Sequence, residues 1–508
     1  MPALPAFHLA DRSGTSHAFP TGRPALLLFA KADCPTCVVS LPVVEAAHRA
    51  FGDACDVWLV AQDADHGTSL VAKGQLTLPV LDDAALTASR AYALEVVPTA
   101  IWADADGHEQ QRLEGFVRAD WQAMLGAFGR RAGRRTAEIA WDELPEWRAG
   151  CGSRSLEITA GARRHAVADD VDPIEFLYEQ GWTDGLPVVP PTPERVAPML
   201  RGTRRDPEEI VAVVPPNLAA ATVEKIAINA VMAGCRPDYL PVVLAAVEAA
   251  CDEAFNLHGV LATTYFVAPV VIVNGPVRKR LGLNDAVNVL GQGHRANATI
   301  GRALQLVVRN VGGGRPGGVD RATLGQPGKY TSCFAEREER SPWDPFHVER
   351  GFAPDESTVT VYAGGAPTGF IDQIARDARA LATTYGLALA AMGHPKHPLA
   401  GETLVVVPPE HADVFGRDGW SKTQVRERIQ EVTTRPARQL LQDAYCAEGL
   451  PPMFAERIPP ETPLPKFRGP EMVKLVVAGG DAGKFAAYFQ SWPVHPHGSD
   501  MVTRRIGG

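Results

Sequence analysis

Short apolar runs alternate with amphipathic stretches from the beginning of this chain onward. The apolar run 25–30 (ALLLFA) and the segment 56–60 (DVWLV) predict buried strands, and the stretch 38–51 between them predicts a helix. The amphipathic segment 119–128 predicts a further helix, and the glycine- and arginine-rich stretch 129–135 after it is typical of a linker. These patterns predict a first α/β domain that ends where the linker begins.

The pattern changes near residue 172, where longer helical and strand segments follow one another. Predicted helices cover residues 193–200, 222–233, 237–251, 298–310, 372–392, 421–431 and 484–491, and predicted strands cover residues 268–274, 357–362, 403–407 and 473–478. Strands that alternate with helices form βαβ units. We therefore expect residues 1–130 to form the first domain, residues 131–171 a linker and bridging segment, and residues 172–508 a large α/β domain, of one or two lobes, with a mixed or parallel sheet.

The composition is that of a globular protein, with 45% apolar and 21% charged residues. A net charge of −9 argues against a nucleic-acid partner, whose backbone attracts basic surfaces. No apolar run reaches the roughly 18 residues that suggest a membrane span. The start of the chain lacks a basic segment followed by an apolar one, so we expect no secretory signal and a cytoplasmic location.

Two cysteines stand between the first buried strand and the first helix, in Cys34-Pro35-Thr36-Cys37. At a helix start, the backbone N–H groups and the helix dipole favour the thiolate that attacks in thiol–disulfide exchange. The same geometry turns the first cysteine outward and the second toward the helix body, so we expect Cys34 to be exposed and Cys37 to be buried. Zinc ribbons use this spacing too, but they need a second ligand pair, and the chain has no other Cys-x-x-Cys. A redox-active dithiol is therefore favoured over a metal site or a structural pair.

The surroundings of this dithiol resemble those found in the thioredoxin superfamily. The resemblance rests on the Cys-x-x-Cys, on Val96-Val97-Pro98-Thr99 before a strand-like segment, and on Phe7-His8-Leu9-Ala10-Asp11 with Gly14, which is similar to the N-terminal hairpin of the thiol-reductase and peroxiredoxin-like branch. It implies a thioredoxin-like fold, a cis peptide bond at Pro98 beside the dithiol, an attacking Cys34 and a resolving Cys37. It implies no cofactor beyond the redox-active disulfide. Reducing thioredoxins carry Gly-Pro between the cysteines, whereas this chain carries Pro-Thr, so the direction of electron flow stays open.

Two cysteines of the large domain lie in segments that suit a functional thiol. Cys235 stands near a predicted helix start beside Arg236, and both features lower a thiol pKa. Cys333 follows a glycine turn and Lys329, in a segment too polar for a core. Either cysteine is a candidate partner of the N-terminal dithiol, although burial without reactivity is the commonest state of this residue type.

Polar residues in loops of the large domain are candidates for binding a small anion. Ligands of α/β sheets bind in loops at the carboxyl ends of strands, and amides at a helix start attract anions. The candidate substrate-binding residues are Trp182, Thr183, Asp184, Asn229, His258, Arg295, Asn297 and Lys329. Structural turns account for the same segments equally well, and neither a Walker A nor a full dinucleotide motif is present.

The segment from Gly181 to Trp343 resembles an uncharacterised bacterial family. The matching stretches are 182–192, 229–237, 256–259 and 295–302. The resemblance implies a link to small proteins that carry a selenocysteine- or cysteine-Gly-Ser-Cys motif and that look like reductase subunits. Cys151-Gly152-Ser153-Arg154 of this chain has Arg in the fourth position instead of Cys, so we assign that segment no role.

These features favour a thiol-dependent oxidoreductase in which the Cys34–Cys37 dithiol exchanges electrons with Cys235 or Cys333 of a domain that acts on a small, anionic substrate. The expected partners are an external thiol reductant or a thioredoxin-reductase-type donor, and a protein with a cysteine- or selenocysteine-Gly-Ser-Cys motif. Two alternatives stay open. The large domain could be a lyase or hydrolase whose catalytic Cys or His is kept reduced, or the protein could bind client thiols or soft metal ions.

Overall fold

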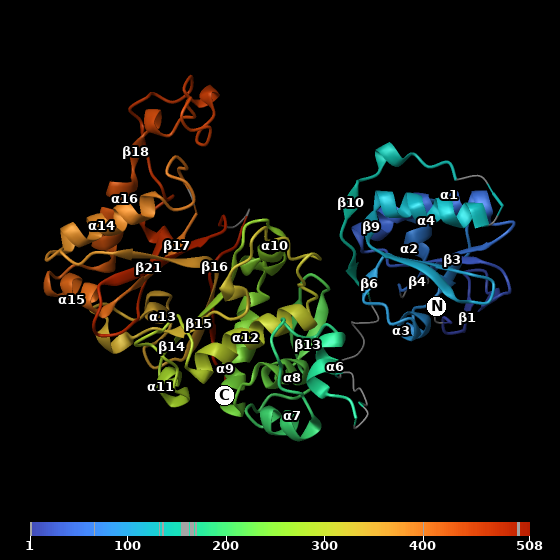
Figure 1. Ribbon diagram of the computed structural model, residues 1–508, viewed down its shortest axis with the longest axis horizontal. Coiled ribbons are helices and arrows are strands. Elements are labelled where there is room, and N and C mark those ends of the chain that lie inside the picture. The colour runs from blue at the N-terminus through green and yellow to red at the C-terminus, as the bar shows by residue number, and fades with distance from the viewer. Residues whose placement is uncertain are drawn as a thin grey trace. The chain divides into compact units, whose positions relative to one another are not determined.

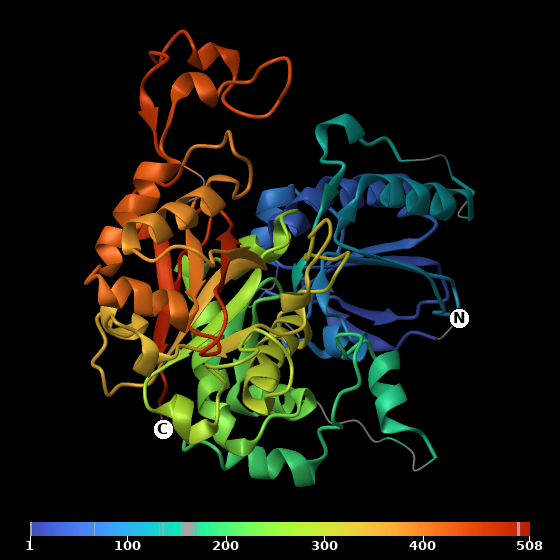
Figure 2. The same ribbon diagram turned by 60° about the vertical axis from the view of Figure 1, so that its left-hand side comes forward.

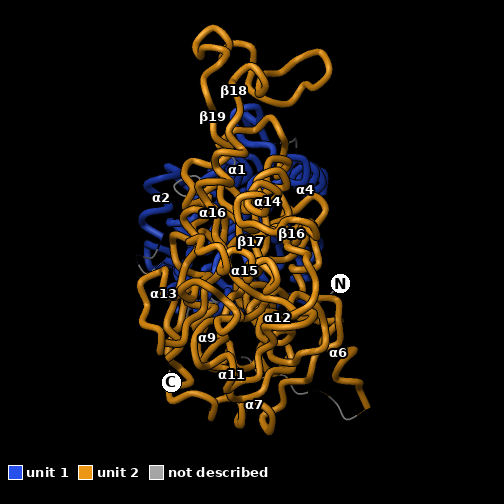
Figure 3. The backbone as a smooth tube through the Cα atoms, turned by 90° about the vertical axis from the view of Figure 1, so that its left-hand side faces the viewer, with its two compact units in different colours: residues 1–160, 214–220 blue, residues 161–213, 221–508 orange. Residues whose placement is uncertain are grey.

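The chain folds into two compact units, which we describe separately (Figure 3). Unit 1 comprises residues 1–160 and 214–220, and unit 2 comprises residues 161–213 and 221–508. The computed structural model describes residues 3–63, 65, 67–131, 133–134, 137–153, 162, 167, 170–399, 401–494 and 498–507. Within these residues, no helix has both the length and the apolar character needed to span a membrane.

Unit 1 contains a five-stranded mixed sheet with helices on it (Figure 1). Its strands are β1 (Phe7–Ala10), β2 (Ser16–Phe19), β3 (Ala25–Ala30), β4 (Asp56–Ala61), β5 (Val80–Asp82), β6 (Val96–Val97), β7 (Thr99–Ala103), β8 (Glu109–Glu114), β9 (Phe116–Val117), β10 (Trp147–Arg148) and β11 (Cys151–Gly152). Its helices are α1 (Pro35–Phe51), α2 (Thr68–Gly74), α3 (Thr87–Ala91) and α4 (Arg118–Arg131).

The strand order of this sheet is β5-β4-β3-β7-β8. β3, β4 and β5 run parallel, and β7 is antiparallel to both β3 and β8. Helices α1 and α4 lie side by side over one face, where Phe128 stacks edge-on against Phe51 and Trp102 (Figures 1 and 2). On the other face, Phe7 packs against Trp58 and Tyr92. This is a thioredoxin-like fold, as the sequence implied.

The first unit extends further along the chain than residue 130, where we expected it to end. Ile139, Trp141 and Leu144 pack against its core, and β10 pairs with β9. β11 pairs with β6. The described part of the expected bridging segment 131–171 therefore completes unit 1 up to Ser153, because its apolar side chains find burial there.

Unit 2 is a seven-stranded mixed sheet with helices, in agreement with the expected α/β class. Its helices are α6 (Pro173–Glu179), α7 (Pro193–Leu200), α8 (Val223–Ala233), α9 (Leu240–Ala250), α10 (Leu257–Ala262), α11 (Val277–Leu281), α12 (Arg295–Asn310), α13 (Phe346–Glu349), α14 (Ala378–Ala390), α15 (Pro409–Arg417) and α16 (Lys422–Thr433). Its strands are β14 (Ala268–Asn274), β15 (Cys333–Ala335), β16 (Thr358–Ile371), β17 (Thr403–Val407), β18 (Arg435–Pro436), β19 (Pro463–Leu464), β20 (Val473–Val477), β21 (Phe485–Ser491) and β22 (Val502–Arg505). Strands β12 (Ile210–Val214) and β13 (Ala219–Thr222) form a separate two-stranded sheet. They contain the ends of the segment 214–220, which belongs to unit 1, whereas the residues before and after it belong to unit 2.

The large sheet has the order β15-β14-β16-β21-β17-β20, and β22 pairs with the first residues of β16. Only the pairs β14–β15 and β17–β20 are parallel. One apolar core lies where α14, α15 and α16 pack on β17, β20 and β21. It includes Leu381, Phe415 and Val425, all essentially inaccessible to solvent.

The prediction of a helix over residues 484–491 is wrong, because this segment is strand β21. The strand lies in the interior of the sheet, where Ala487 is opposite Gly369 of β16 on one side and Val406 of β17 on the other. A short apolar run fits a buried helix or a buried strand equally well. Here the backbone pairing with β16 and β17 makes the segment a strand.

Candidate active site

The dithiol lies at the junction of β3 and α1, as the sequence predicted. Cys34 is the N-cap of α1, and its Sγ accepts a hydrogen bond from the backbone N–H of Cys37 at 3.3 Å. Pro35 follows at the first helical position, where its missing N–H costs nothing. The Sγ of Cys37 in turn accepts the backbone N–H of Lys31 at 3.5 Å. Local sequence thus sets the spacing and direction of both sulfurs.

The expectation that Cys34 is exposed is wrong, whereas the expected burial of Cys37 is confirmed. Both side chains are 0% exposed. The reason is a segment that we call the strap, residues 146–153, which runs over the site within unit 1. Thr36 Oγ1 donates a hydrogen bond to the carbonyl oxygen of Ala149 at 2.5 Å, which ties the strap to the first turn of α1.

The strap brings a third thiol to the dithiol. Cys151 lies opposite Val97 in the antiparallel pair of β11 and β6, and the carbonyl oxygen of Val97 is 3.5 Å from the Sγ of Cys34. Sequence reasoning missed this residue, although Cys151-Gly152-Ser153 was a visible signal. The missing information was the strand pairing. Arg154, which follows, lies outside the described residues.

The three thiols have very different acidities. Hydrogen bonds from Cys151 and then from Cys37 lower the pKa of Cys34 well below that of a free thiol, against the opposing effect of burial. Burial raises the pKa of Cys37 well above its ordinary value. The hydrogen bond that Cys151 donates to Cys34 raises the pKa of Cys151, and burial adds to this. The directions of these shifts favour Cys34 as the first of the three thiols to lose its proton.

Pro98 lies beside the dithiol, and the Val97–Pro98 peptide bond is cis. The carbonyl oxygen of Val97 is 3.5 Å from the Sγ of Cys34, so a protonated Cys34 donates to it. Thr99 Oγ1 donates to the carbonyl oxygen of Val96 at 2.6 Å and holds the turn. The site of unit 1 thus combines Cys34, Cys37 and Cys151 with this loop.

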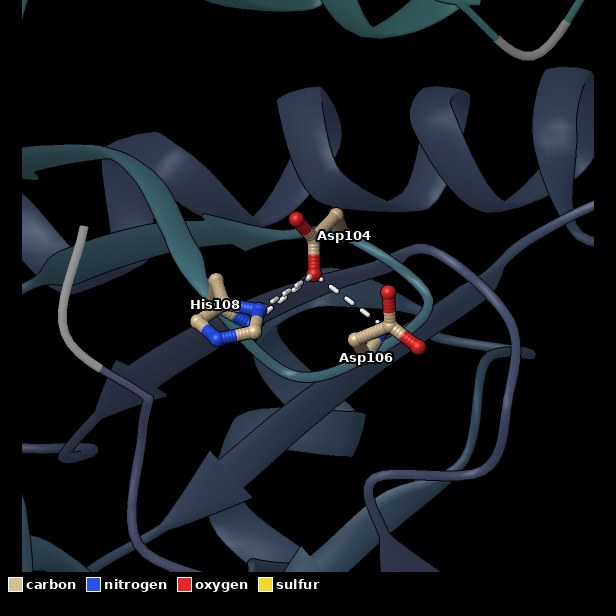
Figure 4. Close-up of side chains that lie close together, drawn as sticks. All are labelled: Asp104, Asp106 and His108. Carbon is tan, nitrogen blue, oxygen red and sulfur yellow. Dashed lines mark hydrogen bonds and ion pairs between the residues drawn. The ribbon is translucent and has the colours of Figure 1, made fainter.

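The turn between β7 and β8 holds another group of polar side chains, Asp104, Asp106 and His108 (Figure 4). Asp104 Oδ1 accepts the backbone N–H groups of Asp106 at 3.1 Å and His108 at 2.9 Å. The carboxylate therefore caps a tight turn, which accounts for the arrangement without a ligand.

The two candidate thiols of unit 2 are buried. Cys235 donates to the carbonyl oxygen of Thr299 at 3.3 Å, and burial raises its pKa to about 12. Burial also raises the pKa of Cys333, and the charge of a Cys235 thiolate would raise it further, so the two thiols lie in the same region. The predicted helix-start effect on Cys235 is outweighed by the loss of hydration.

Four of the candidate anion ligands, Trp182, Thr183, Asp184 and Asn229, lie together, and three of them contact side chains of α12. Asp184 receives two hydrogen bonds from the guanidinium of Arg302, at 2.7 and 2.8 Å. Asn310 Nδ2 donates to the carbonyl oxygen of Trp182 and to Oδ1 of Asn229. Thr183 accepts the backbone N–H of Gly185 next to them. These polar groups bind one another, which is the structural role that the sequence left open.

The other four candidates have different partners, and two of them, Arg295 and Asn297, belong to the first turn of α12. The side chain of Asn297 exchanges two hydrogen bonds with the backbone of Asn284. Arg295 donates to the carbonyl oxygen of Gly234, and Lys329 forms an ion pair with Asp320 at 2.8 Å. His258 is exposed on α10.

Unit 2 contains a second cluster of buried polar side chains, which the sequence did not predict. Asn274 ends β14, and its Nδ2 donates to Oε2 of the fully buried Glu336 at 2.5 Å. Burial raises the pKa of Glu336. Neither ring nitrogen of the buried His347 has a hydrogen-bond partner among the described residues, although Nδ1 comes within 3.9 Å of Glu338. An asparagine at the end of an apolar strand was the signal that could have located this group.

Comparison with known proteins adds only distant structural likenesses. No protein-family model matches the chain. No curated protein matches it either. Among solved structures, the thioredoxin domain of a thiol-disulfide oxidoreductase from Bacteroides vulgatus aligns at 20% identity and a TM-score of 0.23, over 25% of this chain and 95% of that one. An exposed lipoprotein thioredoxin from Streptococcus pneumoniae aligns at 23% identity and a TM-score of 0.21, over 24% of this chain and 96% of that one. These alignments are too distant to assign a reaction to this chain, so the assignment depends on the residues of the site.

Proposed function

We propose that unit 1 is a thiol–disulfide oxidoreductase, with Cys34 as the attacking thiol and Cys37 as the resolving thiol. The observation that carries the proposal is the position of Cys34 at the N-cap of α1, one turn before Cys37. A lowered pKa of Cys34 beside a raised pKa of Cys37 divides the roles, because only the thiolate attacks.

The cycle transfers two electrons to a client disulfide. The Cys34 thiolate attacks one client sulfur, the client S–S bond breaks, and the other client sulfur leaves as a thiolate. Cys37 then loses its proton and attacks the Sγ of Cys34. The mixed disulfide breaks, the Cys34–Cys37 disulfide forms, and the second client thiol is released. An external thiol reductant returns the disulfide to the dithiol. With a reduced client dithiol the same steps run in reverse, and the Cys34–Cys37 disulfide oxidises the client.

Unit 2 receives no redox step in this proposal. Cys235 and Cys333 are buried thiols whose raised pKa values work against attack. Asp184, Asn229 and Asn297 are engaged within the protein. A small anionic substrate of unit 2 and a partner with a Cys-Gly-Ser-Cys motif stay predictions from the sequence. No specific observation favours a lyase or hydrolase in unit 2, or a protein that binds client thiols or soft metal ions.

A redox titration of the full chain tests the proposal. The protein is equilibrated in buffers of reduced and oxidised glutathione, free thiols are alkylated, and disulfides are assigned by peptide mapping. We expect a Cys34–Cys37 disulfide that forms and disappears reversibly, and reduction of a glutathione-linked peptide that is lost in Cys34→Ser. Cys55→Ser is the matched control, since Cys55 is a buried thiol of the same unit. A wild-type protein in which Cys34 stays a free thiol in every buffer would refute the assignment.

A further inference from the structure

The strap places Cys151 beside Cys34, which is the position that a thiol needs for disulfide exchange with Cys34. The residue opposite Cys151 in the strand pair is Val97, and the carbonyl oxygen of the same Val97 is 3.5 Å from the Sγ of Cys34. Cys151 is the largest influence on the pKa of Cys34, and Cys34 is the largest influence on the pKa of Cys151, as expected of two side chains that lie close together. A strand that adds to an edge by backbone pairing, and so positions one side chain in a site, is a general mode of peptide recognition.

The strap is held on both sides of Cys151. Before it, β10 pairs with β9, and Thr36 binds the carbonyl oxygen of Ala149. After it, the backbone N–H of Ser153 donates to the carbonyl oxygen of Glu95 at 3.0 Å, and Gln62 Nε2 donates to Ser153 Oγ at 2.7 Å. These contacts fix the register, so the approach of Cys151 to Cys34 is built into the fold of unit 1.

Two positions of the strap, Gly150 and Gly152, require the absence of a side chain. A Cβ atom on Gly152 would lie 1.6 Å from the carbonyl oxygen of Asn217. A Cβ atom on Gly150 would lie 2.3 Å from Cγ1 of Val96 and 2.9 Å from the carbonyl oxygen of Val97. Gly150 therefore allows the backbone next to Cys151 to come close to the loop before Pro98.

We propose that Cys151 is a resident exchange partner of the Cys34–Cys37 site, so that the strap is a built-in client that also covers the site. This inference rests on the proposed function. In the oxidised site, Cys151 loses its proton and its sulfur attacks the Sγ of Cys34. The Cys34–Cys37 bond breaks, the Cys34–Cys151 bond forms, and Cys37 leaves as a thiolate that takes up the proton. One disulfide replaces another, no electrons are gained or lost, and attack by Cys37 reverses the step.

The structure indicates a consequence for external clients. Cys34 and Cys37 are inaccessible while the strap is in place, so an external disulfide reaches Cys34 only when the strap lifts. Cys151 thus competes with external clients for one sulfur. An intramolecular thiol has an effective concentration that external thiols rarely match.

A trapping experiment on the full chain tests this. Cys37→Ser removes the resolving thiol, and oxidised glutathione is added to form the Cys34–glutathione disulfide. We expect Cys151 to displace glutathione, so that peptide mapping finds a Cys34–Cys151 disulfide and released reduced glutathione. In Cys37→Ser/Cys151→Ser the glutathione should stay on Cys34, and in the control Cys37→Ser/Cys55→Ser the Cys34–Cys151 disulfide should still form. Thermal unfolding of each variant checks that the fold is kept.

The outcomes separate this inference from the proposed function. If wild-type protein forms the Cys34–Cys37 disulfide but glutathione stays on Cys34 in Cys37→Ser while Cys151 remains free, the resident-partner inference is wrong and the oxidoreductase stands. If Cys34 reacts in neither protein, both are wrong.

Discussion

Cys151 lies beside Cys34 and lowers its pKa more than any other group does, although one residue belongs to a strap strand and the other begins helix α1. The contact depends on the pairing of β11 with β6, which brings a distant part of the chain to the dithiol. It has two effects on Cys34, one that favours attack on an external disulfide and one that hinders it. It stabilises the thiolate, and it removes that thiolate from solvent.

Thiolate titration checks the first effect. Because the pKa of Cys34 is lowered mainly by Cys151, reduced protein should keep one thiolate absorbance near 240 nm at a pH where ordinary thiols are protonated. Cys151→Ala should shift this transition to higher pH, whereas Cys55→Ala should leave it unchanged. A single transition near the value of a free thiol in both wild type and Cys151→Ala would contradict the assigned hydrogen bond.

The same shift makes the stability of reduced unit 1 depend on pH. The folded pKa of Cys34 lies below the unfolded value of 9.0, so the folded state binds fewer protons between the two. This contribution to stability is present above the unfolded pKa and is lost as the pH falls toward the folded pKa. Urea unfolding from pH 9 downward should show the loss in wild type and a smaller slope in Cys34→Ser. Equal slopes would argue against a buried thiolate.

Displacing the strap should open the site. In Gly150→Val, the new side chain collides with Val96, and overpacking of this kind typically costs about 1–3 kcal/mol. If that cost weakens the closed state, iodoacetamide should label Cys34 on the order of tenfold faster or more. Gly126→Ala in α4 is the control, since its new Cβ would meet only Arg130 at 3.5 Å. An unchanged labelling rate in Gly150→Val would mean that the strap does not limit access.

We expect the ion pair Asp184–Arg302 to stabilise the folded state. Its side chains are 9% and 15% exposed and form two charge-assisted hydrogen bonds. A double-mutant cycle with Asp184→Asn and Arg302→Gln should give a coupling free energy of about 1–3 kcal/mol for unfolding. The exposed pair Arg438–Glu461 should give roughly 0–1 kcal/mol in the same experiment. Comparable small values for both pairs would reopen the prediction that Asp184 binds a substrate.

A buried cation in unit 2 offers a second stability test. The side chain of Arg278 is 3% exposed and pairs with Asp285, Glu338 and Glu339. Arg278→Met leaves carboxylates without their partner and should lower the free energy of unfolding by roughly 3–5 kcal/mol. The neighbouring Lys279→Met removes a 66% exposed cation, so its effect should stay within about 0.5 kcal/mol. Chemical denaturation measures both, and equal effects would contradict the role given to burial.

Much of the local structure could be predicted from the sequence. The spans 193–200 and 268–274 were placed correctly as a helix and a strand. The dithiol motif was placed at a strand-to-helix junction, which is where the structure has it. These features succeed because hydrophobic period, proline position and helix-start chemistry act between residues that are near in sequence.

Other features were decided only by the tertiary structure. Residues 485–491 form a strand because β16 and β17 accept it on both sides, not because of their own pattern. The reactivity expected of Cys235 and Cys333 is opposed by burial that no local motif reports. Cys151 reaches Cys34 through a two-residue strand pair, and such a pair has no sequence signature of its own. The sequence by itself thus determined which residues can do thiol chemistry at the start of α1. Which other thiol meets Cys34 was decided by long-range pairing, because burial and contact depend on every part of the chain that folds around them.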